Sequence, residues 1–150
     1  MRDMSIEYRP IRYGSADYQQ TLALRDDILR KPWGHSIDED DLSKENSDLV
    51  FGAFDGGILV GVAILQEDGT AYNRLRYMAV DAGYRRRGIG AVIAREFESR
   101  SRKAGKAGIR LMARTSITAF YETLGYRLDG EPFIPDHIPV EHVMMTLHFS

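Results

Sequence analysis

Three apolar runs separated by tight turns occupy the middle of the chain and constrain its fold most strongly. The runs span residues 49–54, 58–65 and 70–80, and the turns between them contain Asp-Gly-Gly and Gln-Glu-Asp-Gly. Strand-like runs joined by short glycine-containing turns form antiparallel hairpins. We therefore expect an antiparallel meander of three strands at the centre of the molecule.

Helical and strand-like segments alternate around this meander. Residues 6–12 are expected to form a strand, and their proline favours an edge position. Asp17 is a candidate cap for a helix that ends at the Lys-Pro-Trp-Gly segment. Further expected elements are a helix over 88–105 closed by Gly105, a strand over 108–113, a short helix over 117–124 closed by Gly125, and strands over 126–133 and 141–149. This order predicts an α+β (mixed α/β) fold, with helices on the faces of a mixed sheet.

Length and composition favour a single domain over residues 1–150. The chain has no cysteine, which excludes disulfides, thiolate metal sites and a cysteine nucleophile. The four histidines show no helical pairing that would indicate a metal site, so none is expected. Apolar runs stay well short of the roughly 20 residues of a membrane helix, and the first residues do not resemble a signal peptide. We therefore expect a cytoplasmic protein without a membrane partner.

Positive charge is concentrated in one part of the chain. Residues 74–114 hold twelve Lys and Arg against three acidic residues, whereas the whole chain holds 20 basic and 22 acidic residues. A basic segment in an acidic chain indicates an anionic ligand that binds locally. Nucleic acid is the rival partner, but the basic residues fall on several expected elements and lack the interleaved aromatics of single-strand binders. We therefore expect no nucleic-acid partner.

Residues 80–90, Val-Asp-Ala-Gly-Tyr-Arg-Arg-Arg-Gly-Ile-Gly, connect an expected strand to an expected helix. The first N–H groups of a helix have no intrahelical partner and attract anions. Gly88 and Gly90 remove Cβ atoms and permit unusual φ values, while Arg85, Arg86 and Arg87 add charge suited to phosphate. The segment is thus a candidate diphosphate cradle. Solvated arginines beside an ordinary glycine turn remain the alternative.

A second motif, Phe120-Tyr121-Glu122-Thr123-Leu124-Gly125-Tyr126, follows at a suitable distance. Together with Arg-Arg-Arg-Gly-Ile-Gly at 85–90, it resembles the GNAT family, the Gcn5-related N-acetyltransferases. The resemblance covers the chain from about Leu49 onward. It implies a mostly antiparallel, splayed central sheet flanked by helices. It also implies acetyl-CoA as co-substrate and an amine of a small molecule or peptide as acceptor.

The resemblance further implies where coenzyme A would bind. Its pyrophosphate would lie on the backbone N–H groups of 85–91, and its pantetheine arm would bond the backbone of Met78 and Val80. The opening for this arm is expected where the strand that ends at Val80 separates from the strand over 108–113. The expected contacts are Met78, Ala79, Val80, Arg85, Arg86, Arg87, Gly88, Ile89, Gly90, Ala91, Ser116 and Phe120.

The expected reaction is direct attack of the amine on the acetyl thioester, with an oxyanion bound by the N–H of Val80 or Met78. The resemblance makes Tyr121 the candidate general acid, although its place on an apolar helix stripe equally suits a packing role. Many family members carry a glutamate base on the strand before the cradle, and here that strand has none. A water chain, Glu67, Glu141 and His142 are the alternatives, and His142 is preferred because it titrates near neutrality.

The acceptor side and the assembly are less constrained by the sequence. Trp33 and His35 are candidates to line the acceptor pocket, and Trp33 is equally suited to anchor the first helix. The acidic run at 38–41 either attracts a cationic amine or forms a solvated loop. A coenzyme A-binding sensor without catalysis is the alternative function. Both a monomer and a homodimer are compatible with the sequence.

Overall fold

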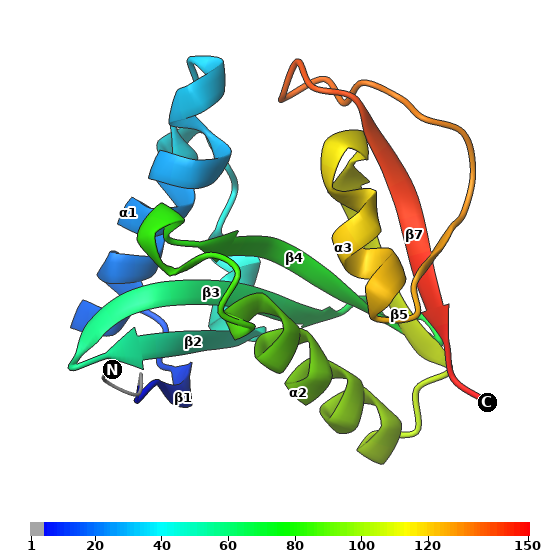
Figure 1. Ribbon diagram of the computed structural model, residues 1–150, viewed down its shortest axis with the longest axis horizontal. Helices are drawn as coiled ribbons and strands as arrows, with labels where there is room; N and C mark the ends of the chain where they lie inside the picture. Colours follow the sequence, from blue (N-terminus) through cyan, green and yellow to red (C-terminus); the bar gives the residue numbers. More distant parts are fainter. Residues whose placement is uncertain (1–4) are drawn as a thin grey trace.

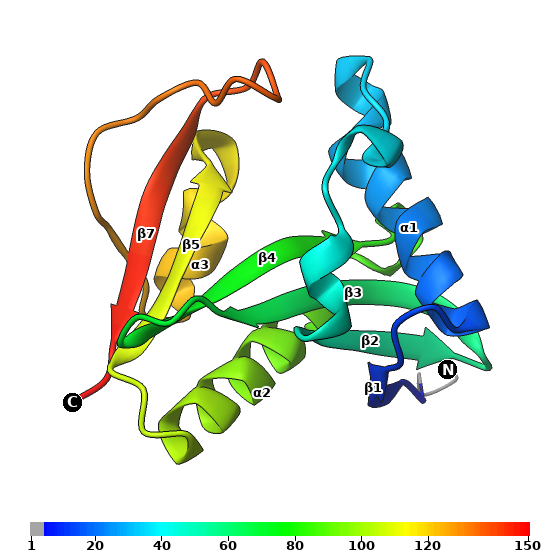
Figure 2. The ribbon, with the colours of Figure 1, turned by 180° about the vertical axis from the view of Figure 1, so that it is seen from behind.

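The computed structural model describes residues 5–150 and shows a seven-stranded sheet with three α-helices in that range (Figures 1 and 2). The strands are β1 (Glu7–Ile11), β2 (Leu49–Asp55), β3 (Ile58–Glu67), β4 (Tyr72–Val80), β5 (Gly108–Arg114), β6 (Arg127–Leu128) and β7 (His142–His148). The α-helices are α1 (Ala16–Leu29), α2 (Ile89–Lys103) and α3 (Thr118–Thr123). Short 3-10 turns are η1 (Lys31–Trp33), η2 (Ile37–Glu39), η3 (Ser43–Asn46), η4 (Ala82–Tyr84) and η5 (Thr115–Ile117).

The sheet order is β1-β2-β3-β4-β5-β7-β6. Every neighbouring pair is antiparallel except β4 and β5, which run parallel. The predicted meander of three antiparallel strands is confirmed as β2-β3-β4, and Pro10 lies on the edge strand β1, where its missing N–H breaks no pairing on the outer side. The mixed, mostly antiparallel sheet flanked by helices is therefore confirmed.

Strands β4 and β5 pair over only part of their length. Tyr72–Leu75 lies beside Gly108–Leu111, and the remaining halves of both strands diverge (Figure 1). Just past the last pair, Tyr77 has a φ of 56°, and the register between β3 and β4 shifts there. Such a bulge bends a strand and increases its twist. The bulge at Tyr77 thus accounts for the separation of the C-terminal halves of β4 and β5.

Two cores lie on opposite faces of the sheet. Ile89, Ile93 and Phe97 of α2 are almost fully buried against β2, β3, β4 and β5. The other face is covered by α1, which buries Tyr18 and Leu24 beside alternate residues of β2 and β3. Because successive strand residues point to opposite faces, the same strands serve both cores. The near-continuous apolar character of β3 follows from this double burial.

Two details of the sequence prediction are corrected. The cap of α1 is Ser15, whose Oγ accepts a hydrogen bond from the Tyr18 N–H at 3.1 Å, whereas Asp17 binds Arg9 at 2.7 Å. The expected strand over 126–133 reduces to β6 and one isolated bridge between Phe133 and His142. Prolines at 132 and 135 lack the N–H groups that a continuous ladder requires. Residues 129–141 therefore form a loop that arches from β6 to β7 (Figure 1).

Candidate functional site

The start of α2 has the open geometry expected of an anion-binding helix end. Gly88 is its N-cap, with φ of 80°, and no side chain of residues 5–150 caps the helix. The first intrahelical bond runs from the Val92 N–H to the Gly88 carbonyl at 3.0 Å. The N–H groups of Ile89, Gly90 and Ala91 therefore precede the helical ladder and point outward from its positive end.

The two glycines at this helix start serve different purposes. A Cβ on Gly88 would meet no atom of residues 5–150 within 4 Å, so the positive φ is what favours glycine there. A Cβ on Gly90 would lie 3.1 Å from Cζ of Phe120 and 3.8 Å from Sδ of Met78. Gly90 thus makes room for Phe120 and Met78, while Gly88 serves the backbone conformation. Phe120 and Met78 thus pack directly against the cradle.

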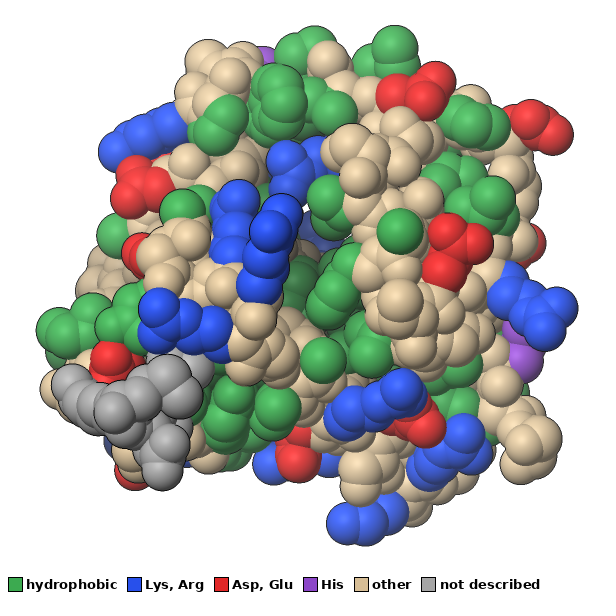
Figure 3. Space-filling view, viewed as in Figure 1, with side chains coloured by type: hydrophobic (Ala, Val, Ile, Leu, Met, Phe, Trp, Pro, Cys, Tyr) green, Lys and Arg blue, Asp and Glu red, His purple; other side chains and the backbone are tan. Residues whose placement is uncertain are grey.

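The three arginines before the helix also differ. All three are exposed. Arg85 donates from Nε to the Val80 carbonyl at 3.3 Å, and Arg86 has a φ of 63°. The guanidinium of Arg87 lies 5.3 Å from the ring centroid of Tyr84, so it is directed to the side of the loop. On the face shown in Figure 3, basic side chains border a hollow in the middle of the molecule.

The end of β4 leads from the cradle into the splay. The Asp81 N–H donates to the Val60 carbonyl of β3 at 2.8 Å, and Ala79 lies opposite Val62. Backbone groups alternate in direction along a strand, so those of Val80 point to the other side, where β5 has diverged. Ala79 instead buries its side chain in the α1 core. The Val80 N–H is therefore available on the side that opens between the strands, whereas the Val80 carbonyl already accepts the Arg85 Nε–H at 3.3 Å.

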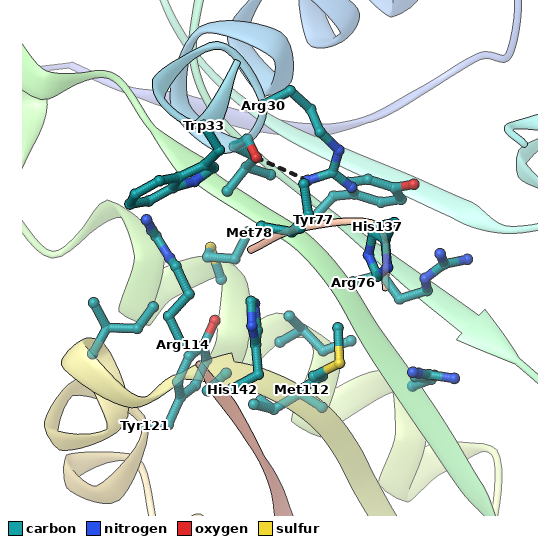
Figure 4. A pocket seen from close by; sticks show the side chains of 17 residues that line it. Arg30, Trp33, Arg76, Tyr77, Met78, Met112, Arg114, Tyr121, His137 and His142 are labelled. Carbon is teal, nitrogen blue, oxygen red and sulfur yellow. Dashed lines mark hydrogen bonds between the residues drawn. The ribbon is translucent and has the colours of Figure 1, made fainter. Parts of the chain in front are cut away.

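A cavity of about 190 Å³ lies in this opening (Figure 4). Its walls come from β4, β5, the end of α1, η1, η5, α3 and the loop before β7. The lining residues are Leu29, Arg30, Trp33, Arg74, Leu75, Arg76, Tyr77, Met78, Leu111, Met112, Ala113, Arg114, Ile117, Tyr121, His137, Ile138 and His142. The cavity thus brings together both predicted catalytic residues and Met78, which come from distant parts of the sequence.

Tyr121 is buried except at the cavity. Its ring packs between those of Phe120 and Tyr126, with centroids 4.9 and 5.7 Å away. The hydroxyl points into the cavity, near the side chain of Arg114 (Figure 4). Burial raises the pKa of Tyr121 well above 10, and the positive charge of Arg114 acts in the opposite direction. The phenol therefore holds its proton at neutral pH.

His142 begins β7 and is also buried, with its ring at the cavity (Figure 4). Its Nδ1 lies 2.6 Å from the Val140 carbonyl oxygen. A carbonyl oxygen only accepts, so Nδ1 carries the hydrogen and Nε2 of the neutral ring is the acceptor. Burial lowers the pKa of His142 below 6.5, and Arg114 and His137 lower it further against the Val140 hydrogen bond. The ring is thus neutral at pH 7.

Apart from Trp33, the other side chains predicted for the acceptor side and for the general base lie outside this cavity. Glu67 pairs with Lys106 at 2.7 Å, and exposed Glu141 accepts a hydrogen bond from Thr115 Oγ1 at 3.0 Å. His35 lies beside Glu39 at 3.2 Å and Ser116 is exposed on η5, whereas Trp33 does line the cavity. Of the candidate bases on side chains, only His142 is brought to the same space as Tyr121.

The acidic run at 38–41 is partly engaged within the protein. Asp40 forms an ion pair with Arg30 at 2.6 Å and accepts a 2.6 Å hydrogen bond from the Tyr77 hydroxyl. These contacts hold the pKa of Asp40 below its usual range despite its burial. Asp40 therefore fixes the loop after η2 to the bulge of β4 rather than facing a ligand. Asp38, Glu39 and Asp41 are exposed.

Several cavity residues carry no recognisable sequence signal, notably Arg30, His137 and Ile138, which come from separate segments. Arg114 has a usable sequence signal, because it is a charged residue that directly follows the strand expected over 108–113. Among residues 5–150, no group of three or more His, Asp and Glu side chains is placed to hold a metal ion. Within that same range, each helix is too short or too polar to cross a membrane.

Comparison with known proteins gives consistent results. The family description "Acetyltransferase (GNAT) domain" matches residues 15–149. A Bacillus subtilis protein named as an acetyltransferase is 34% identical over 94 residues, which cover 63% of this chain and 62% of that protein. The matched part of the chain thus spans less than two thirds of that relative's length.

Solved structures of similar fold cover nearly the whole chain. A Lactobacillus plantarum protein described as an N-acetyltransferase has a TM-score of 0.79 and 20% identity, covering 98% of this chain and 99% of that chain. A GNAT family acetyltransferase from Elizabethkingia anophelis, solved with acetyl-CoA bound, has a TM-score of 0.69 and 17% identity, covering 96% and 98%. At these identities the likeness establishes the fold.

Proposed function

The chain belongs to the GNAT family of N-acetyltransferases, and from that premise we propose that it transfers the acetyl group of acetyl-CoA to a primary amine held between β4 and β5. The diphosphate of the coenzyme binds the N–H groups of Ile89, Gly90 and Ala91, with Arg85 and Arg86 adding positive charge. The uncapped helix start and the positive φ of Gly88 support this placement.

The pantetheine arm follows the backbone of Met78 and Val80 toward the cavity. The observation that carries the proposal is the position of Met78. Its side chain lines the cavity, while its Sδ lies 3.8 Å from the place of a Cβ on Gly90. Phe120 contacts the same place from α3. One short stretch of β4 therefore connects the phosphate cradle to the space that holds Tyr121 and His142.

The reaction is a direct transfer without a covalent enzyme intermediate. The amine nitrogen bonds the acetyl carbon, the carbon–sulfur bond breaks, and the N–H of Val80 or Met78 stabilises the developing oxyanion. His142 Nε2 accepts the proton that the amine loses, and the Tyr121 hydroxyl protonates the departing sulfur. Exchange with solvent then returns both side chains to their starting states. The tautomer of His142 and the protonated state of Tyr121 suit these roles.

A binding measurement combined with an activity measurement tests this function. Acetyl-CoA is expected to raise the melting temperature, because a ligand at 100 times its Kd adds about 2.7 kcal/mol to the free energy of unfolding. Pantetheine, which lacks the diphosphate, is the matched control and should give a much smaller shift. Release of free thiol should then depend on an added amine. Absence of both the acetyl-CoA shift and amine-dependent thiol release would refute the proposal.

A further inference from the structure

The cavity between β4 and β5 is lined by positive charge without a carboxylate. Four arginines and two histidines contribute to its walls, and none of its lining residues is Asp or Glu. The positively charged lining residues are Arg30, Arg74, Arg76 and Arg114, and the imidazole rings of His137 and His142 complete the polar lining. Arg30 is neutralised by Asp40 at 2.6 Å. The remaining three arginines are the subject of this inference.

Arg74, Arg76 and Arg114 lack an ion-pair partner in the part of the chain that the structure describes, residues 5–150. All three are partly buried. Asp48 is close enough to influence Arg76, and Asp68 is close enough to influence Arg74, yet neither carboxylate forms an ion pair with these arginines. Partly buried charges are costly unless they are paired. Three such groups on one cavity indicate that a ligand supplies the missing negative charge.

Within the proposed binding mode, coenzyme A places none of its negative charge inside the cavity. Its phosphates lie at the start of α2, and residues 85–91 are absent from the cavity walls. The parts of acetyl-CoA that reach the cavity, the pantetheine end and the thioester, are uncharged. Burial lowers the pKa of Arg114 and Arg85 of the cradle lowers it further, so the diphosphate lies within electrostatic reach of Arg114. For Arg74 and Arg76 the acceptor is the remaining source of an anion.

We propose that the acceptor is a small amine that carries an anionic group of its own, a carboxylate or a phosphate, bound by Arg76 and Arg114. The proposal rests on the function proposed above. The cavity of about 190 Å³ suits a molecule of amino-acid size. Trp33, Leu29 and Ile138 supply apolar walls for the rest of the acceptor. The terminal amine of a peptide fits less well, because its neighbouring carboxyl is an uncharged amide.

The same charges assist the chemistry. A cationic environment disfavours an ammonium ion and so lowers the pKa of a bound amine. The acceptor then enters as the free amine more readily, which compensates for the missing glutamate on β4. The anionic group of the acceptor is drawn to the arginines, while its amine is left for His142.

Matched acceptors test this inference. Phenylalanine is compared with phenylalaninamide and 2-phenylethylamine, and phosphoethanolamine with ethanolamine. The readouts are kcat/KM with acetyl-CoA, and the Kd of each N-acetylated product for the CoA-loaded protein. Only the anionic acceptor of each pair can form charged hydrogen bonds with the arginines. At least one anionic acceptor should therefore have a kcat/KM about 10-fold to 100-fold higher than that of its uncharged counterpart. Where turnover is too slow to measure, the Kd values of the two N-acetylated products are compared instead, and the anionic product should bind more tightly.

Arginine variants test whether Arg76 and Arg114 cause the preference for anionic acceptors. Arg76→Gln and Arg114→Gln should each reduce the preference for the anionic acceptor about 10-fold and leave the Kd of acetyl-CoA unchanged. Arg12→Gln, which removes an exposed guanidinium outside the cavity, is the control and should change neither.

The outcomes separate this inference from the proposed function. A preference confined to phosphate or to carboxylate identifies the source of the anion and supports the proposal. Equal or better use of the uncharged amines, with acetyl-CoA binding intact, overturns it while the acetyltransferase function stands. Weaker acetyl-CoA binding in the Arg76 and Arg114 variants, with acceptor preference unchanged, overturns it as well. Failure to bind acetyl-CoA at all instead contradicts the proposed function.

Discussion

Tyr121 combines a buried ring with a hydroxyl at the cavity, so its two possible roles can be separated. Tyr121→Phe keeps the ring contacts and removes only the proton donor. We expect kcat to fall about 100-fold or more, with the Kd of acetyl-CoA and the free energy of unfolding nearly unchanged. Steady-state kinetics and denaturant unfolding measure these quantities.

Tyr126 supplies the control for this change. Its buried hydroxyl has no hydrogen-bond partner in residues 5–150, and Tyr126 lies outside the cavity walls. Tyr126→Phe should therefore leave kcat unchanged and should not destabilise the fold, because it removes an unsatisfied polar group. Equal kcat in the Tyr121→Phe variant and the wild type would leave Tyr121 with a packing role only.

His142 should control the acidic side of the pH profile. Because burial lowers its pKa below 6.5, the ring stays neutral until the pH falls beneath that value, and protonation then removes the acceptor at Nε2. We expect log(kcat/KM) to drop below pH 6.5 in the wild type. His142→Gln should lower kcat/KM about 100-fold and flatten this limb, as measured with acetyl-CoA saturating.

His148 is the matched control on the same strand. It is exposed, and its Nδ1 lies 2.8 Å from the Tyr72 hydroxyl, outside the cavity. His148→Gln should keep both the rate and the acidic limb. If His142→Gln retains the limb, the base is another group, such as a water chain or the acceptor itself.

At the scale of elements, the sequence predicts correctly those strands and helices whose apolar residues follow a regular local pattern. The β2-β3-β4 meander and α2 follow from apolar runs, and Gly105 and Gly125 end their helices with φ of 76° and 99°. The sequence predicts a strand over 126–133, but only Arg127–Leu128 and an isolated bridge at Phe133 form, because Pro132 lacks the N–H that a continuous ladder requires. Local patterns thus failed where the missing N–H groups of a few residues decide pairing.

Helix α1 shows a second limit. Its buried face includes Arg25, which is fully buried and forms a bidentate pair with Glu45 of η3 at 2.8 and 2.9 Å. The Tyr18 hydroxyl donates to the same carboxylate at 2.6 Å. Charged residues in a helix normally indicate its solvent face, so this contact cannot be predicted from the helix pattern. The pair fixes η3 against α1 and, through Arg25 over the Tyr77 ring, approaches the bulge of β4.

At the scale of the whole molecule, the basic segment 74–114 serves two places. Its middle holds Arg85, Arg86 and Arg87 of the proposed cradle. Its ends, Arg74 and Arg76 on β4 and Arg114 on β5, line the cavity. That second place depends on strands β4 and β5 being parallel neighbours that separate, and the parallel pairing follows from a crossover through α2. Charge counts predict one anion, and the arginines of the cavity are the basis of our proposal that the acceptor carries a second.

The splay and the helix start should therefore respond together to the coenzyme. The amides of Met78 and Val80 lie beyond the β4–β5 pairing, and those of 89–91 precede the helical ladder of α2. Acetyl-CoA should slow hydrogen exchange at both sets about 10-fold or more, by giving these N–H groups partners, in addition to any global stabilisation. Mass spectrometry of short peptides, or NMR, measures this. Pantetheine should slow exchange only at the amides of Met78 and Val80. The hydrogen-bonded amides of β3 serve as the measure of global stabilisation. Unchanged exchange at 89–91 with acetyl-CoA bound would place the diphosphate elsewhere.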